Sequence, residues 1–406
     1  MLRRIVPALG VIALASPAAM SQEIAKGLYL DGWIDTILSA SDTQYETTGA
    51  TSNSGANFAA AFTTAAKVKI GWNVTDQVSG KIGVKFNNNV TSTTARTQAD
   101  GVTPATDDNG NAIYDTTSSS DAYLQEAFFS ANFGQGFNVT GGKMISFVGL
   151  QSAEPTGLFR VGYTPSISLY TPDMLGVTVG YSNDQFAAMV IVNNGNFDDT
   201  GYNDGPAQQT QNNVSHNLGY GIDLTYNLPE KMGNVNLEFA WDPAAGTSTN
   251  TTDGTTRPSD VYQIGLNATL KPTDKTTLLA EAIYRAETGA ATKLKDKVAG
   301  TTKSATKEDF AWMVLANQVV STEGIPASVS GSFGQYAPGF NNDKSNDSTN
   351  TASEVAAALL TNPFGSSSFG ANLEVAYAWY DGVKGQNPTG EEGGTTISLE
   401  GLVVIP

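Results

Sequence analysis

The segment at residues 57–89 is the feature of the sequence that most constrains the fold. Apolar or weakly polar residues occupy alternate positions over residues 58–74, and two of the intervening positions are lysines. Alternation with a period of two predicts a β-strand with one apolar face. A short turn at residues 75–77 follows, and the alternation resumes over residues 78–86 with two more lysines opposite the apolar face. The segment therefore predicts a β-hairpin.

Both predicted strands are longer than the roughly five or six residues that are typical of globular proteins. Their apolar residues share one face, and their lysines share the other. Long strands that alternate in this way are typical of the wall of a transmembrane β-barrel, whose outside meets lipid and whose inside meets water.

The first residues of the chain predict export. Arg3 and Arg4 precede an apolar run at residues 5–15 and a group of small residues that ends at Ser21. This order predicts a signal peptide at residues 1–21 and a mature domain at residues 22–406. No later run reaches the roughly eighteen apolar residues of a membrane helix, so residence in a membrane requires a barrel.

Composition excludes several other classes of function. The formal charge of −17 becomes −19 after the two leader arginines are removed, which argues against a nucleic-acid partner. The chain has no cysteine, so neither disulfides nor thiol chemistry is available. His216 is the single histidine, which argues against most metal sites and catalytic triads. We expect no cofactor and no bound metal.

The same alternation recurs along the chain and predicts about sixteen strands, within a range of 14 to 18. Lys143 falls on an apolar face, which suggests a bulge at Gly141 and Gly142. The segment at residues 354–361 could equally begin a helix. The expected strands are at residues 27–39, 57–74, 78–89, 122–133, 137–147, 175–182, 185–193, 217–228, 234–242, 261–271, 277–287, 310–320, 327–336, 354–361, 371–381 and 395–405.

Short turns alternate strictly with long polar segments between these strands, and aromatic residues lie near both strand ends. This pattern is typical of outer-membrane barrels with short periplasmic turns and long extracellular loops. We therefore predict an all-β fold, a transmembrane antiparallel β-barrel. The alternative is a soluble β-sandwich with the aromatic residues in its core.

The run at residues 126–196 resembles the outer-membrane β-barrel porins, in its strands, its Gly-Lys turn, its inserted loop and its "VNNG" end. The last strand departs from the family, because it ends in Val-Val-Ile-Pro rather than in an aromatic residue. The resemblance implies a passive diffusion channel for small hydrophilic solutes and ions in the bacterial outer membrane. It also implies contact with membrane lipid and lipopolysaccharide, assembly as a homotrimer, and no enzymatic activity.

The connection at residues 148–174 differs from the other long loops, because it is rich in large apolar residues and contains three prolines. Such a segment should pack against the protein rather than extend into water. The resemblance implies that it folds into the barrel and narrows it, with Glu154, Arg160 and Asp173 as the charged groups there. The alternative is an extracellular lid packed on itself.

Four lysines share the inward face of the opening hairpin. Pairing outward from the turn places Lys67 opposite Lys85, with Lys69 and Lys81 on the diagonals. Like charges in neighbouring positions destabilise a sheet unless something offsets them. We expect an unpaired basic patch, with Glu126 on the inward face of a later strand and Glu154 across the pore. The net charge favours cations, and these lysines would moderate or reverse that preference.

Three other interpretations remain open at this point. The chain could be a non-conducting barrel or surface protein with a structural or adhesive role. Ser215 beside His216 suggests a hydrolase, but neighbours on a strand point to opposite faces. The acidic loop segments at residues 107–111 and 198–199 could bind calcium weakly.

Asp31 and Asp35 lie on one inward face, where we expect them to line the lumen.

Overall fold

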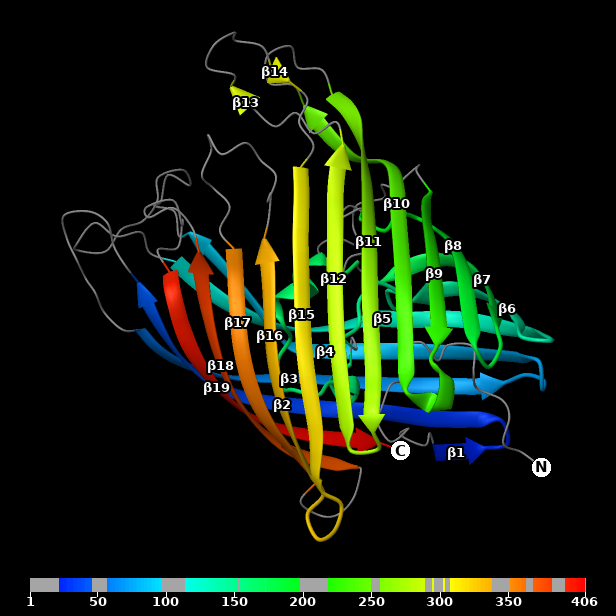
Figure 1. Cartoon of the computed structure of the whole chain (residues 1–406), viewed down its shortest axis with the longest axis horizontal. Helices are drawn as coiled ribbons and strands as arrows, with labels where there is room; N and C mark the ends of the chain where they lie inside the picture. The colour runs from blue at the N-terminus through cyan, green and yellow to red at the C-terminus, as the bar shows by residue number, and fades with distance from the viewer. Residues whose placement is uncertain are drawn as a thin grey trace.

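Sixteen antiparallel strands close into a barrel in the computed structural model (Figure 1). The structure describes residues 22–45, 57–95, 114–151, 154–171, 173–197, 218–249, 256–288, 294–295, 302–303, 307–337, 351–362, 368–381 and 391–405. Strands that follow one another in the sequence pair with one another around the ring. The ring closes because β2 near the N-terminus pairs with β19 at the C-terminus.

The wall strands agree with the sixteen predicted segments, and the segment at residues 354–361 lies in a strand rather than a helix. They are β2 (Leu28–Tyr45), β3 (Asn57–Asn73), β4 (Val78–Ala95), β5 (Tyr114–Gly134), β6 (Phe137–Met144), β7 (Met174–Ser182), β8 (Phe186–Asn193), β9 (Gly219–Asn227), β10 (Gly233–Thr249), β11 (Thr256–Thr273), β12 (Thr276–Thr288), β15 (Lys307–Ser321), β16 (Ala327–Ala337), β17 (Thr351–Thr361), β18 (Phe369–Asp381) and β19 (Glu391–Ile405).

Several short elements accompany the barrel. The strand β1 (Gln22–Ala25) adds to β2, while β13 (Leu294–Lys295) and β14 (Thr302–Lys303) pair only with each other. The described residues also form three 3₁₀ turns: η1 (Pro155–Gly157), η2 (Pro165–Leu169) and η3 (Pro229–Lys231). In the part of the chain that the structure describes, no helix has the length and apolar character needed to cross a membrane.

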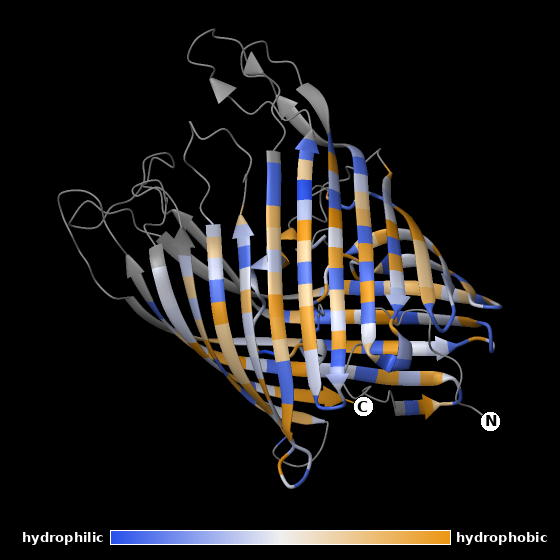
Figure 2. Ribbon diagram, in the orientation of Figure 1, coloured by the Kyte–Doolittle hydropathy of each residue, from blue (hydrophilic) through white to orange (hydrophobic). Residues whose placement is uncertain are grey.

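The two faces of each strand differ in polarity, as Figure 2 shows by the alternating colours along the wall. On β9, Ile222 points outward and is 41% exposed, whereas the neighbouring Asp223 points inward and is 4% exposed. An apolar outside and a polar inside are what a bilayer requires of a barrel. The closed ring also excludes a two-sheet sandwich.

The folding free energy lost on placing an arginine at an outward position should therefore depend on the depth of that position in the bilayer. Leu224 lies on the outer face near the middle of β9, and Tyr226 lies on the same face beside the short turn. Leu224→Arg should cost about 2 to 4 kcal/mol of folding free energy, because its charge would enter the lipid midplane. Tyr226→Arg should cost about 0 to 1 kcal/mol near the interface. Equal costs, measured by urea unfolding in lipid vesicles, would contradict this orientation.

The predicted bulge lies elsewhere than expected. The pairing of β6 with β5 and β7 is regular through Gly141 and Gly142. The irregularity is on β5, where Gln125 is the extra residue opposite β4, so Gln125 and Glu126 both face inward. Lys143 remains on the outer face, and its ammonium group donates to the carbonyl oxygen of Leu124 at 2.8 Å. The lysine thus satisfies a carbonyl beside the bulge.

Short turns gather at the end of the barrel that also carries β1 and the end of β19 (Figure 1). One of them is the turn at residues 134–136, where Gly134, Gln135 and Gly136 all have positive φ angles. Glycine adopts that conformation without steric cost. The aromatic side chains Phe137 and Tyr181 pack beside this turn with their rings tilted, and Tyr220 stacks on Trp241 near the other end. This arrangement matches two interfacial girdles.

Candidate functional site

The connection between β6 and β7 lies inside the barrel. Its turn η2 packs against β12, β15 and β16 on one side of the lumen, and η1 contacts β19. Leu169 is 0% exposed and packs against Ile283 and Ala311, which are inward-facing residues of the wall. Phe159 and Leu150 pack on a second apolar group of inward residues. Removing these apolar surfaces from water holds the loop in the lumen rather than above it.

Two wall glutamates fasten the base of this loop. Glu238 on β10 accepts a hydrogen bond from the backbone N–H of Gly149 at 3.0 Å. Glu281 on β12 accepts from the N–H of Leu150 at 2.6 Å and from the hydroxyl groups of Ser166 and Tyr170. Charge-assisted hydrogen bonds of this kind are stronger than those between neutral groups. The loop therefore begins and ends against the same part of the wall.

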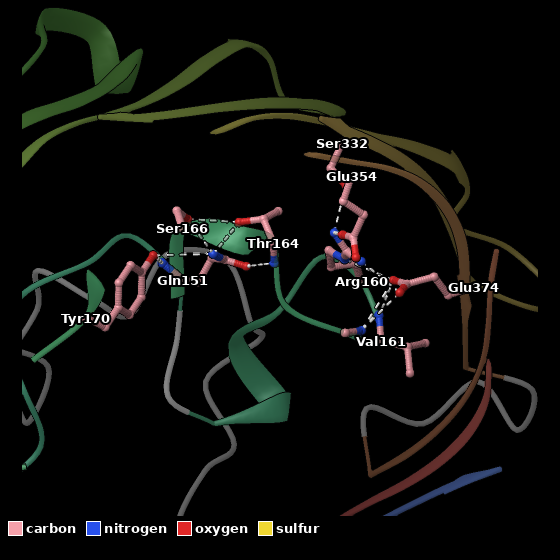
Figure 3. A network of polar contacts seen from close by, with 10 residues as sticks. Gln151, Arg160, Val161, Thr164, Ser166, Tyr170, Ser332, Glu354 and Glu374 are labelled. Atoms are coloured by element: carbon pink, nitrogen blue, oxygen red, sulfur yellow. Dashed lines mark hydrogen bonds and ion pairs between the residues drawn. The ribbon is translucent and has the colours of Figure 1, made fainter. Parts of the chain in front are cut away.

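Gln151 joins the two arms of the loop, as Figure 3 shows. Its amide nitrogen donates to the hydroxyl oxygen of Thr164 at 2.7 Å, and its amide oxygen accepts from the N–H of Thr164 at 2.9 Å. Residues between these two positions form a lobe, which we define as residues 154–163. The lobe extends from this closed base toward other strands of the barrel.

Arg160 ties the lobe to three wall strands (Figure 3). Its guanidinium group pairs with Glu374 at 2.9 and 3.1 Å, with Glu354 at 2.7 Å and with Ser332 at 3.0 Å. Glu374 also accepts from the N–H of Val161 at 2.9 Å. Arg160 is 4% exposed. A guanidinium fork that meets a carboxylate with two parallel bonds fixes position as well as charge.

Glu154 ties the lobe to β3. Its carboxylate lies 2.7 Å from the ammonium nitrogen of Lys67 and 2.6 Å from that of Lys69. Lys67 also pairs with Glu126 at 2.7 Å, and Lys69 pairs with Asp31 at 3.4 Å. Together with Lys81, which lies 3.6 Å from Glu126, these residues form a chain of alternating charge. We call this set the charge chain: Asp31, Lys69, Glu154, Lys67, Glu126 and Lys81.

The expectation of an unpaired basic patch is therefore wrong. The hairpin register places Lys67 opposite Lys85 as predicted. However, Glu126 on β5 pairs with Lys67 and Lys81, and Glu154 in the loop pairs with Lys67 and Lys69, so the charges of these three ammonium groups are neutralised. Lys67 is 0% exposed, and a buried ammonium group requires such partners because the loss of hydration is costly.

Electrostatics stabilise both attachments of the lobe. Burial raises the pKa of the Glu154 carboxyl, but the ammonium groups of Lys69 and Lys67 outweigh that effect and lower its pKa to about 2. Burial lowers the pKa of Arg160, while Glu374 and Glu354 raise it above its ordinary value. Both groups are therefore charged at neutral pH.

The lowered pKa of Glu154 predicts how its attachment responds to acid. The ionised Glu154 carboxylate should stabilise the folded porin fully above the ordinary pKa of 4.5, and this stabilisation should disappear as pH falls toward 2. The pH-dependent part of the effect should be about 3 kcal/mol, from the size of the shift. Urea unfolding of the parent and of Glu154→Gln across this range would measure it. A difference between the two that stays constant down to pH 2 would contradict the assignment.

The structure separates the predicted site residues into groups. Lys67, Lys69, Lys81, Glu126 and Glu154 lie together in the charge chain. Arg160 instead lies against β16, β17 and β18. Asp173 directly precedes β7, at the far end of the loop from Glu154.

The four wall glutamates that hold the loop were not predicted from the sequence. Each stands on an inward face, and the apolar inward residues Leu279, Ile283 and Met313 lie nearby on β12 and β15. Inward-facing residues that change from polar to apolar on neighbouring strands indicate that another segment of the chain packs against that part of the wall. The glutamates are Glu238, Glu281, Glu354 and Glu374.

A cavity of about 630 Å³ lies between the lobe and the short-turn end of the barrel. Leu158, Phe159 and Arg160 form its boundary on the lobe side, and residues of β12 and β15 to β19 surround it. His216, Ser215 and the acidic segments at residues 107–111 and 198–199 lie outside the described residues, as does the predicted signal peptide. Within the described ranges, no group of three or more histidine, aspartate or glutamate residues is arranged to hold a metal ion.

Several solved structures share this fold. The outer membrane channel DcaP of Acinetobacter baumannii matches with a TM-score of 0.59 and 14% identity, over 95% of this chain and 99% of that one. OprB of Pseudomonas putida matches with a TM-score of 0.58 and 8% identity, over 94% of each chain. OmpF of Salmonella typhi matches with a TM-score of 0.54 and 13% identity, over 95% of this chain and 100% of that one. Identities this low support the fold alone.

The family comparison goes further than the fold. No curated protein matches the chain. The family described as "Putative beta-barrel porin-2, OmpL-like" matches residues 27–322, which is well over half of the sequence. The sequence, the closed sixteen-strand barrel and the inserted loop agree with this match. The chain therefore belongs to this family of outer-membrane β-barrel porins.

Proposed function

We propose that this porin is a passive diffusion channel through the bacterial outer membrane for small hydrophilic solutes and ions, narrowed by the loop at residues 148–174. The observation that carries this proposal is a loop fastened at several points inside a closed barrel whose inner face is polar and charged. A pore that conducts selectively needs a constriction with charged groups at a defined distance from the path. Membership of a porin family favours a channel over an enzyme.

The residues of the constriction are part of the proposal. We assign the wall side of it to Lys67, Lys69, Lys81, Lys85 and Glu126, and the loop side to Glu154, Arg160 and Asp173. Their support is that Glu154 and Arg160 each attach the lobe to a different part of the wall. With these two groups charged and buried, the lobe should act as a fixed obstacle rather than as a lid.

Assembly and processing extend the same proposal. A barrel with an apolar exterior is expected to contact membrane lipid and lipopolysaccharide, and porins of this fold class commonly associate as homotrimers. Residues 1–21 would act as an export leader and residues 22–406 as the mature domain. The competing function is a non-conducting barrel with a structural or adhesive role, which the packed lobe favours and the cavity of about 630 Å³ opposes.

Liposome swelling separates these two functions. Vesicles containing the purified mature porin should swell in isotonic solutions of small sugars and amino acids, at rates that fall steeply as the solute grows. Such a size dependence reports the narrowest cross-section of an aqueous path. Vesicles that do not swell in the smallest solute would favour the structural role. Swelling at a rate that does not depend on solute size would contradict the presence of a constriction.

A further inference from the structure

Two carboxyl groups from opposite ends of the sequence meet on the inner wall. Asp35 of β2 and Glu400 of β19 both face inward, and their side chains are hydrogen-bonded to each other. The register explains the contact, because Asp35 pairs with Leu402, which lies two residues beyond Glu400. The amide nitrogen of Asn372 donates to Glu400. A hydrogen bond between two carboxyl groups needs a proton between them, so the pair carries one negative charge.

No basic side chain offsets this charge among the described residues. Asp35 is 8% exposed and Glu400 is 6% exposed, yet neither forms an ion pair with a lysine or arginine in the described ranges. One oxygen of Asp35, Oδ1, has no hydrogen-bond partner there. A buried carboxyl oxygen in this state is costly unless water or a cation reaches it.

Tyr163, where the lobe rejoins its base at Thr164, lies close to the same pair. Burial and the charges of Asp35, Glu154 and Glu400 raise the pKa of the Tyr163 hydroxyl to about 12, so the phenol lies within electrostatic reach of these carboxyl groups. Glu400 also lines the cavity of about 630 Å³ on the short-turn side of the lobe. The pair thus lies between this end of the lobe and an open aqueous space.

The neighbouring charge chain contributes little net charge. It contains three carboxylates and three ammonium groups in alternation, at distances of 2.6 to 3.6 Å. Closely spaced opposite charges cancel at the distance of a passing ion. The Arg160 cluster carries one net negative charge, because a single guanidinium group meets the carboxylates of Glu354 and Glu374. Between that cluster and the charge chain, the negative charge without a basic partner is that of Asp35 and Glu400.

We propose that Asp35 and Glu400 determine the charge selectivity of the channel, so that small cations and solutes bearing an ammonium group pass between the lobe and the wall at β2 and β19 in preference to anions. This inference rests on the proposed function, because it names the class of solute that the channel favours. Acidic side chains beside a narrow path attract cations and repel anions, and a path near the Debye length of about 8 Å leaves them poorly screened.

The shared proton makes a sharp test possible. An amide has the shape of a protonated carboxyl group and can donate the same hydrogen bond. Asp35→Asn alone and Glu400→Gln alone should each keep one carboxylate and leave the selectivity close to that of the parent. The double variant should lose the charge. Its permeability ratio for K⁺ over Cl⁻ should fall roughly fivefold, the factor that one unit charge produces at about 8 Å in water.

The measurement is the reversal potential of the purified porin in a planar bilayer under a KCl gradient. Asp223→Asn is the matched control, because Asp223 is an equally buried inward carboxyl on β9 that hydrogen-bonds Asn236. We expect the parent to prefer K⁺, and the control and both single variants to follow it. A double variant that selects like the parent would overturn the inference.

The parent alone provides a second test, which does not depend on how any variant folds. A parent channel that prefers Cl⁻ would overturn the assignment of selectivity while leaving the channel function intact. A parent that produces no conductance would instead overturn the proposed function itself. The two failures are therefore distinguishable.

Discussion

Replacement of residues 155–163 by two glycines is expected to raise single-channel conductance roughly twofold or more, because the narrowest section of a pore limits its current. The lobe carries the turn η1, the side chain of Phe159 and the Arg160 attachment, all of which lie within the lumen. Thr164 and Gln151 are kept, so their paired hydrogen bonds still close the base of the loop. The wall strands are untouched, and the barrel should remain folded.

The control for this variant is Leu266→Ala, a change on the outer face of β11 that faces lipid. It should leave the conductance unchanged. Retention of heat-resistant migration in detergent would show that both variants form the barrel. A glycine replacement that conducts like the parent would contradict the lobe as the constriction, and the narrowest point would then lie elsewhere along the lumen.

Arg160→Met is expected to destabilise the porin by about 3 to 5 kcal/mol, because it leaves the buried carboxylate of Glu374 and the half-buried carboxylate of Glu354 without their cation. Glu374 and Glu354 lie 2.9 and 2.7 Å from the guanidinium group, and Glu374 also holds the backbone of Val161. The measurement is the free energy of unfolding by urea in lipid vesicles. The variant should also show larger fluctuations of open-channel current, since the lobe loses one of its attachments.

Two further variants make the Arg160 prediction specific. Lys81→Met removes a partly exposed partner that lies 3.6 Å from Glu126, so it should cost about 0 to 1 kcal/mol. Adding Glu354→Gln and Glu374→Gln to Arg160→Met should recover part of the loss, because the unpaired buried charges are removed. If Arg160→Met cost no more than Lys81→Met, the guanidinium group would not anchor the lobe.

Local patterns were enough to predict the barrel wall. Alternation along each strand fixed which residues face lipid, and the short turn at residues 75–77 fixed the register that places Lys67 opposite Lys85. The unusual apolar content of residues 148–174 distinguished the loop that packs within the protein from the polar loops. These features depend on neighbours in the sequence or on a short hairpin, which is why a single sequence reveals them.

Long-range partners could not be predicted in the same way. The neutralisation of Lys67 depends on Glu126, whose inward direction coincides with a bulge at Gln125, and on a loop residue 87 positions away. Arg160 meets Glu374 across 214 positions. The Asp35 and Glu400 pair forms only because β2 and β19 close the ring. Predicting such contacts requires knowledge of the path of the loop and of the closure of the barrel. The alternation of apolar and polar residues along single strands does not contain this information.

The most direct test of the channel itself is the current through a planar lipid bilayer after addition of the purified mature porin in symmetric KCl. We predict discrete upward steps of uniform size that scale with the salt concentration, as expected for an open aqueous path with a fixed constriction. A bilayer that stays silent, although the same preparation shows a folded barrel by its resistance to heat in detergent, would contradict a diffusion channel and favour the structural role.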